Sequence, residues 1–212
     1  MKKLLLIDGH ALMYRAFHAL PPLTTPRGEP IAAVFGFVSI LLKVLRELKP
    51  DFLAAAFDRE EATFRHLAYK DYKATRPPTP DDLVPQFAKI KEVLAAWGIK
   101  SFEEAGLEAD DIIGTIVNKL KKEEVDIYIL TGDLDTLQLV SDRVRVITPK
   151  KGPSETVIYG IDEVKERFGG LKPSQMNDYK AMKGDPSDNI KGIPGVGEKT
   201  AIQLLLEFET LE

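Results

Sequence analysis

Residues 4–9, LLLIDG, decide the class of fold. Four consecutive apolar side chains suit a strand that is buried on both faces, and an aspartate follows them at once. The same pattern returns in FLAAAFD at residues 52–58 and in IYILTGD at residues 127–133. A fourth strand is expected at VRVI, residues 144–147, so the sequence predicts a sheet of buried strands, three of which end at an aspartate.

Helical patterns separate these strands. Apolar residues recur at three- and four-residue spacings in 31–48, and we expect further helices at 81–97, 108–122 and 201–208. The alternation predicts an α/β fold in which helices cover both faces of a mostly parallel central sheet.

Two stretches depart from this alternation. Residues 59–80 are polar and aromatic and end in several prolines, and the segment from residue 172 onward predicts a small helical module. We therefore expect an α/β core over 1–171, which includes 59–80, followed by a module over 172–212.

The composition excludes several kinds of site. None of the 212 residues is cysteine, which excludes a thiol nucleophile, a Cys-ligated zinc and an iron–sulfur cluster, and favours a cytoplasmic location. No apolar run approaches the roughly 18 residues of a membrane span, so no membrane partner is expected. The 29 basic and 33 acidic residues give a net charge of −4, which by itself argues against a polyanionic partner.

The acidic residues nevertheless gather where a ligand is expected. A parallel sheet binds ligands outside the carboxyl ends of its strands, so Asp8, Asp58, Asp133 and Asp135 should share one crevice and require cations there. Oxygen donors without cysteine or a histidine cluster favour Mg²⁺ or Mn²⁺ over zinc, and their number suits two or more ions. The complete set of candidate metal ligands is Asp8, Asp58, Glu108, Asp110, Asp111, Asp133, Asp135, Asp185 and Asp188.

The alternative is that each acid is a helix cap or a solvated turn residue, which is common for acids in a first helical turn, such as those at 108–111. Three strands that end in aspartate at one sheet edge favour the shared site. Apart from these nine acids, 29 basic residues stand against 24 acidic ones, so the acidic chain remains compatible with a polyanion.

Basic and aromatic residues alternate in 64–76, FRHLAYKDYKATR. Basic groups contact phosphates and aromatic faces stack on bases, a combination typical of single-strand binding. The alternative is a solvated helix face with its aromatic residues in the core. If the segment is one helix, five residues share a face, namely Arg65, Tyr69, Tyr72, Lys73 and Arg76.

Residues 192–200, GIPGVGEKT, are glycine-rich and precede an apolar helix. They do not fit a P-loop, because Glu198 separates the last glycine from Lys199 and we expect the preceding segment to be helical or turn-like. A glycine-rich hairpin that opens a helix still offers free N–H groups to a phosphate. The alternative is a tight turn between two helices.

Five long stretches together resemble the 5′ nuclease domain of bacterial DNA polymerase I, within the flap endonuclease superfamily. They are LLLIDGHALMYRAFHAL, FDREEATFRHLAYKDYKATRPPTP, GLEADDIIGT, ILTGDLDTLQL and MKGDPSDNIKGIPGVGEKTA. The resemblance spans nearly the whole chain. It implies a PIN/5′ nuclease-like fold, metal ligation by the nine acids above, a helical arch over 59–80, and a helix-hairpin-helix at 192–200 that holds duplex DNA, often through K⁺.

The resemblance also implies roles for individual residues. Arg15, Lys73 and Arg76 are the expected catalytic phosphate contacts, and Tyr14 is a candidate for stacking on a base. The remaining expected DNA contacts are Phe64, Arg65, Tyr69, Lys70, Tyr72, Gly192, Gly195, Gly197, Lys199 and Thr200.

The expected function is therefore metal-dependent hydrolysis of phosphodiester bonds at 5′ flaps or nicked duplex DNA, as in primer removal and repair. The family domain continues through more helices, so we expect this chain to be a monomeric fragment of a protein that also carries polymerase modules. Two alternatives are a haloacid dehalogenase-type phosphatase, suggested by residues 133–136, and a non-catalytic DNA-binding module of the same fold. Magnesium-dependent cleavage of a labelled flap distinguishes all three.

Overall fold

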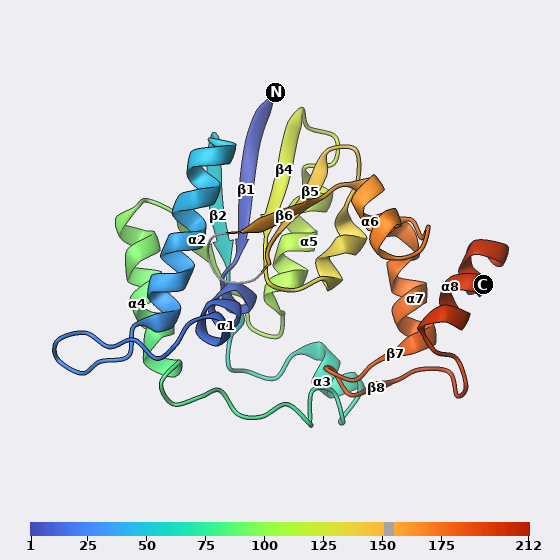
Figure 1. The fold of residues 1–212 in the computed structure, drawn as a ribbon, viewed down its shortest axis with the longest axis horizontal. Helices are drawn as coiled ribbons and strands as arrows, with labels where there is room; N and C mark the ends of the chain where they lie inside the picture. Colours follow the sequence, from blue (N-terminus) through green and yellow to red (C-terminus); the bar gives the residue numbers. More distant parts are fainter. Residues whose placement is uncertain (151–154) are drawn as a thin grey trace.

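A computed structural model describes residues 1–150 and 155–212 (Figure 1). Its main sheet has six strands in the order β3-β2-β1-β4-β5-β6. The first five strands pair in parallel, and only β6 runs antiparallel, against β5. Their bounds are β1 Lys2–Asp8, β2 Phe52–Ala56, β3 Lys100–Phe102, β4 Val125–Leu130, β5 Val144–Pro149 and β6 Thr156–Tyr159.

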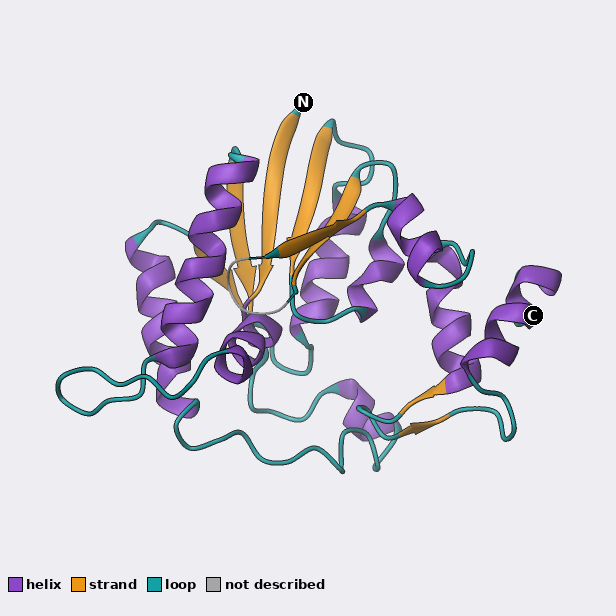
Figure 2. Ribbon diagram, viewed as in Figure 1, coloured by secondary structure: helices purple, strands orange, loops and turns teal. Residues whose placement is uncertain are grey.

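Helices cover both faces of this sheet, as predicted (Figure 2). One face packs against α1 (Gly9–Ala19), α2 (Ala32–Leu48) and α4 (Val84–Ala96). The other packs against α5 (Ala109–Lys119), the 3₁₀ helix η1 (Asp135–Leu139), α6 (Ile161–Arg167), α7 (Met176–Lys183) and α8 (Glu198–Phe208). A further 3₁₀ turn, η2 (Pro173–Gln175), leads into α7.

Strand β1 shows why both layers form. Successive side chains of a strand point to opposite faces, so Leu5 and Ile7 join the cluster of α1, α2 and α4, while Leu4 and Leu6 join the opposite one. That second cluster also contains Ala201 and Leu205 of α8, so the C-terminal helices share a core with the sheet. Because these helices pack into the same core as the sheet, the division into a core over 1–171 and a module over 172–212 stays a prediction.

The predicted elements differ from the observed ones mainly where strands are short. Strands β3 and β6 were not predicted, because three or four residues carry too little periodicity, and helices α1, α6 and α7 were not predicted either. The helices expected at 31–48, 81–97 and 108–122 are present within a few residues, and α8 begins three residues before the predicted 201. In the described ranges 1–150 and 155–212, no helix combines the length and hydropathy of a membrane span.

Residues 64–76 do not form one helix, which was the condition for a shared basic and aromatic face. Helix α3 covers only Phe64–Ala68, Tyr69 is extended, and Lys73 has a left-handed φ of 56°. The bend has tertiary causes: the Lys73 amide donates to the carbonyl of Asp188 at 3.0 Å, and the Tyr72 hydroxyl donates to Glu108 at 3.0 Å. The five basic and aromatic side chains therefore do not share one helical face.

Candidate active site

The carboxyl end of β1 places Asp8 at the centre of the acidic crevice. Asp8 caps α1, since its Oδ1 accepts from the Ala11 amide at 2.9 Å. Its Oδ2 accepts from the Thr131 hydroxyl, which follows β4, at 2.7 Å. Burial raises the pKa of Asp8 to about 7 despite these hydrogen bonds, and the charges of Asp58 and Asp133 add to the rise.

Asp110, in the first turn of α5, holds a carboxylate oxygen without a protein partner. Its Oδ1 is buried and accepts no hydrogen bond from any residue in 1–150 or 155–212. Burial raises the pKa of Asp110 to about 8, followed by repulsion from Asp8, Asp133, Asp58 and Asp135. These five carboxylates therefore lie close enough to interact, as the strand ends predicted.

Two further acids are fixed by local hydrogen bonds. Asp58 follows β2 and accepts from the Ala109 amide at 2.6 Å, which ties this strand end to the start of α5. Asp133 accepts from the Asp135 amide at 2.9 Å, and its own amide donates to the Thr131 hydroxyl. Thr131 thus orders both Asp8 and Asp133. Thr131 was not predicted as a site residue, although its place directly after β4 was a usable signal.

A second acidic cluster lies beside the first. Carboxylate oxygens of Asp135, Asp185 and Asp188 lie within 4.8 Å of one another. The ammonium of Lys180 is 2.7 Å from both Asp135 and Asp185, and Arg76 is 2.6 Å from Asp188.

The two acids that pair with Lys180 have opposite pKa shifts. Burial alone would raise the pKa of Asp185, but hydrogen bonds from Lys180 and Ser187 lower it to about 2. Burial and then Asp133 raise the pKa of Asp135, against the opposing effect of Lys180. Lys180 was not predicted as a site residue, and nothing local in α7 marks it.

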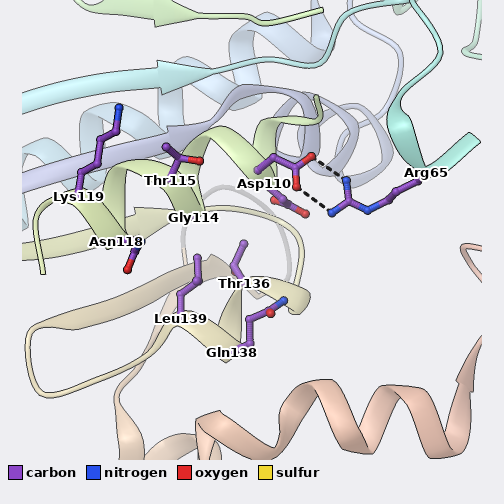
Figure 3. A pocket seen from close by; sticks show the side chains of 10 residues that line it. Arg65, Asp110, Gly114, Thr115, Asn118, Lys119, Thr136, Gln138 and Leu139 are labelled. Atoms are coloured by element: carbon purple, nitrogen blue, oxygen red, sulfur yellow. Dashed lines mark hydrogen bonds and ion pairs between the residues drawn. The ribbon is translucent and has the colours of Figure 1, made fainter. Parts of the chain in front are cut away.

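Glu108 and Asp111 are compensated by groups from segment 59–80. Lys73 lies 2.8 Å from Glu108. Arg65 donates two hydrogen bonds to Asp111, at 2.7 and 2.8 Å (Figure 3). Although burial opposes the effect, Arg65 lowers the pKa of Asp111. The nine acids thus form two groups: within the described residues, only Asp8, Asp58, Asp110 and Asp133 have no lysine or arginine partner.

These four acids fit a hard divalent cation. They offer only oxygen donors, they repel one another, and the buried Asp110 Oδ1 lacks a partner. His10 lies 3.9 Å from Asp58, but burial lowers its pKa, so it supplies little positive charge at neutral pH. The crevice is therefore arranged for a cation that residues 1–150 and 155–212 do not supply.

Segment 59–80 is joined to the hairpin of β7 (Gly184–Asp185) and β8 (Ile190–Lys191), as Figure 1 shows. Asn189 donates from its side-chain amide to the Asp71 carbonyl at 2.9 Å, and Tyr69 donates from its hydroxyl to the Asn189 carbonyl at 3.2 Å. Arg76 adds a bond to the Ser187 carbonyl. Segment 59–80 and the hairpin thus form a continuous bridge beside the acids.

The predicted DNA contacts of this segment differ in accessibility. Phe64 and Tyr69 are 49% and 39% exposed, and Lys70 is exposed. Tyr72 is only 6% exposed and donates to Glu108, so it is not available to stack on a base here. Tyr72 was expected to contact DNA, and this expectation is corrected. Its hydrogen bond to the buried Glu108 could not be predicted without knowledge of the fold.

Arg15 and Tyr14 lie on α1, away from the segment's ion pairs. The Arg15 guanidinium donates to the carbonyls of Pro149, at 3.1 Å, and Lys150. A Cβ at residue 132 would lie 3.0 Å from the Cβ of Arg15. Gly132 therefore lets the loop after β4 approach α1 closely. The Tyr14 hydroxyl contacts that of Thr79, at 2.6 Å. Neither residue has a hydrogen bond or ion pair with the nine acids.

The predicted hairpin contacts separate into two kinds. A Cβ on Gly192 would lie 2.3 Å from the Lys183 carbonyl carbon, so this glycine allows close chain packing and is not explained by DNA contact. At Gly195 and Gly197 a Cβ would meet no atom of the described residues within 4 Å. These two glycines, Lys199 and Thr200 are exposed at the start of α8, open to a ligand.

Family models match both parts of the chain. Residues 3–169 match the N-terminal resolvase-like domain of 5′-3′ exonucleases, and residues 171–212 match their C-terminal SAM fold.

DNA polymerase I of Chloroflexus aurantiacus is 48% identical over 99% of this chain and 22% of that protein. DNA polymerase I of Bacillus subtilis is 45% identical over 100% of this chain and 24% of that protein. The chain thus spans about a quarter of the length of these curated relatives.

Solved structures share the fold. A 5′-exonuclease of bacteriophage T5 with bound zinc ions aligns with a TM-score of 0.78 and 23% identity, over 99% of this chain and 76% of that one. The catalytic core of Rad2 in complex with a DNA substrate aligns with a TM-score of 0.59 and 19% identity, over 99% of this chain and 63% of that one.

Proposed function

The chain belongs to the 5′-3′ exonuclease family, and we propose that it is a metal-dependent nuclease that cuts 5′ flaps or nicked duplex DNA. The uncompensated carboxylates of Asp8, Asp58, Asp110 and Asp133 carry this proposal. Four acids at one sheet edge, with a buried oxygen lacking a partner, destabilise the fold unless a cation binds there. Mg²⁺ or Mn²⁺, in two or more copies, is the proposed occupant.

The proposed reaction is hydrolysis of one phosphodiester bond. Water oxygen bonds to phosphorus as the bond from phosphorus to the 3′ oxygen breaks, which leaves a 3′-hydroxyl on the released piece and a 5′-phosphate on the other. Bound divalent ions would supply an activated water and stabilise the leaving oxygen. Lys73, Arg76 and Arg15 would offset the negative charge that grows on the phosphate.

The remaining parts of the proposal concern DNA binding. Segment 59–80 would contact the 5′ single strand through Phe64, Tyr69 and Lys70. The open N-terminus of α8 would bind a duplex phosphate, with K⁺ as a further ion there. We also propose that the chain acts as a monomer in the cytoplasm. We propose that it is joined to polymerase modules in the full-length protein, since the DNA polymerases I that it resembles are about four times as long.

The test is cleavage of a 5′-labelled flap in Mg²⁺, with EDTA as the metal-free condition. Asp58→Asn and Asp133→Asn should each lower the cleavage rate by about 10³-fold, while flap binding in Ca²⁺ stays within about threefold, because each change removes a metal ligand and no phosphate contact. Asp162→Asn is the matched control, since its side chain is 92% exposed on α6. Unchanged cleavage by both crevice variants would overturn the proposal, and DNA binding without wild-type cleavage would identify a non-catalytic module.

A further inference from the structure

A cavity of about 420 Å³ lies between α5 and η1 (Figure 3). Gly114, Thr115, Asn118 and Lys119 of α5 line one wall, and Gln138 and Leu139 of η1 line the other. Its volume falls within the range of small-ligand sites. None of these six residues belongs to the acidic site described above.

The inner end of the cavity opens onto the acidic crevice. Asp110, whose Oδ1 lacks a protein partner, lines that end together with the Arg65–Asp111 pair. Arg65 donates hydrogen bonds to both carboxylate oxygens of Asp111. It therefore neutralises Asp111 and has few donors left for another anion. A ligand in this cavity would therefore meet the metal site at one end.

The outer end of the cavity has a different chemistry. Thr115, Asn118 and Gln138 offer hydroxyl and amide groups, which suit the edges of a nucleobase. Lys119 has no hydrogen bond or ion pair with any residue that the structure describes, and its flexible stem lets the ammonium reach a phosphate. At 1.5 Å of rise per helical residue, Lys119 lies about 13 Å along α5 from Asp110. The cavity thus combines metal-site carboxylates, neutral hydrogen-bonding groups and a free cation in a row.

The position of the cavity indicates which DNA strand it would receive. Arg65, from segment 59–80, closes its inner end, and none of the described residues after 139 lines it. A second cavity, of about 670 Å³, lies on the side of α7 and the β7–β8 hairpin, where the duplex is proposed to bind. Gln138 lines both, so the two cavities adjoin. A single DNA strand that runs from the acids in the direction away from the duplex would enter the first cavity.

We infer that the cavity between α5 and η1 binds the nucleotide on the 5′ side of the scissile phosphate, with Lys119 as its phosphate contact. This inference rests on the proposed nuclease function. The nucleotide belongs to the piece of DNA that is released, so the cavity would make binding depend on the 5′ flap and not on the duplex.

The first test compares two fluorescent DNAs by anisotropy in Ca²⁺: a nicked duplex, and the same duplex with a two-thymidine 5′ flap. Lys119→Ala should weaken flap binding by about three- to fivefold and lower its salt slope by about 0.7, the loss of one single-strand phosphate contact. Binding of the nick should stay unchanged. Lys121→Ala is the matched control, since Lys121 is exposed two residues further along and does not line the cavity.

The second test fills the cavity without changing charge. A Cβ at residue 114 would meet only Leu139 Cδ2, at 3.9 Å, so the helix can accept a side chain there, and replacing a helical glycine favours the helix. Gly114→Leu should weaken flap binding by about fivefold or more while the thermal midpoint does not fall. Gly114→Ala, which adds only a methyl group, should bind the flap as wild type does.

The outcomes separate this inference from the proposed function. The inference would be overturned if the variants lost affinity equally for the nick and the flap. It would also be overturned if Lys119→Ala and Gly114→Leu both bound the flap as wild type does. In either case, cleavage by the wild-type chain in Mg²⁺ would still support the proposed nuclease function. Failure of the wild-type chain to cleave any flap would instead overturn the proposed function. Loss confined to the flap in Lys119→Ala and Gly114→Leu supports the inference.

Discussion

At the scale of single residues, Asp110 and Asp8 show how far the crevice departs from an ordinary protein surface. Burial raises their pKa values from 3.8 to about 8 and about 7, and neighbouring aspartates reinforce the change. An unfolded chain would return both groups to their ordinary values. The folded, metal-free protein therefore binds more protons than the unfolded chain across this range.

This difference predicts the pH dependence of stability in EDTA. Since the folded state holds the extra protons, the free energy of unfolding should fall as the pH rises from about 4 to about 8. Asp110→Asn should flatten this dependence and raise the thermal midpoint at pH 8 by several degrees, at about 2–4 °C per kcal/mol for a chain of this size. Differential scanning calorimetry in EDTA between pH 5 and pH 8 measures both effects.

The control for this experiment is Asp162→Asn, whose exposed carboxylate should leave the pH dependence as in wild type. A wild-type midpoint that rises between pH 5 and pH 8 in EDTA would contradict the assignment of raised pKa values. Added Mg²⁺ should restore stability at pH 8 in wild type more than in Asp110→Asn, because a ligand stabilises the state that binds it.

Lys73 provides a second prediction at this scale. Its ammonium lies 2.8 Å from Glu108, at the junction of segment 59–80 and the acids. If it meets charge that develops only at the scissile phosphate, Lys73→Ala should lower the single-turnover rate by about 10²-fold and flap affinity by less than about threefold. Lys70→Ala, at an exposed position of the same segment, should instead reduce mainly affinity. Equal losses of rate and affinity in Lys73→Ala would make Lys73 an ordinary backbone contact.

At the scale of elements, the β7–β8 hairpin and α8 use their glycines differently. Gly184 and Gly192 sit where a Cβ would lie 2.4 and 2.3 Å from backbone atoms, so these positions hold the hairpin closed. Gly195 has a φ of +83°, which strains any other residue, but Gly197 is extended with a φ of −96° and open space at its Cβ position. Gly197 is therefore the position where ligand access can be tested with little change in folding.

Gly197→Val is predicted to weaken binding to duplex DNA by about tenfold and to reduce the salt slope by about 0.9, because its side chain would crowd a phosphate at the start of α8. The thermal midpoint should change by less than about 4 °C, the effect of replacing a glycine at the N-cap. Fluorescence anisotropy on a blunt duplex at several salt concentrations gives both binding values. Gly192→Ala should instead lower the thermal midpoint more than duplex affinity, because a Cβ at residue 192 would collide with the backbone of Lys183. Unchanged duplex binding in a folded Gly197→Val protein would assign the duplex to another surface.

At the scale of the whole molecule, buried polar contacts connect helices that are distant in sequence. The N-cap of α2, Ile31, has no side-chain cap. Gln86 of α4 supplies it instead: its fully buried Oε1 accepts from the amides of Ala33, at 2.9 Å, and Val34, at 3.2 Å. Its Nε2 donates to the Asp82 carbonyl at 2.7 Å. This one side chain satisfies the start of one helix from another.

Gln86→Leu keeps the approximate shape of the side chain and should leave these backbone groups unsatisfied. We expect the free energy of unfolding to fall by about 2–4 kcal/mol and the thermal midpoint by roughly 4–16 °C. Thermal unfolding in Mg²⁺ tests this, with exposed Gln203→Leu as the control. Flap cleavage at 25 °C should persist, since Gln86 does not contact the acids. A midpoint within 1–2 °C of wild type would show that relaxation or water satisfies the freed groups.

The sequence alone determined four of the six strands of the main sheet and the place of the acids at their ends. Hydrophobic runs and helical spacing are local signals, and a parallel sheet brings its strand ends to one edge, so Asp8, Asp58 and Asp133 were predicted to lie together without any contact being known. The oxygen-rich donor set likewise followed from composition, and the family resemblance followed from ordered motifs.

Only the tertiary structure decided which of these acids are neutralised. Arg65 reaches Asp111 across 46 residues, Lys73 reaches Glu108 across 35, and Arg76 reaches Asp188 across 112. The same long-range contacts bend segment 59–80 and bury Tyr72, so the segment does not form the single helix that a shared face would require. Periodicity describes neighbours a few residues apart, whereas these ion pairs depend on how loops cross above the sheet. The identity of the uncompensated acids is therefore a property of the folded chain and not of any local pattern.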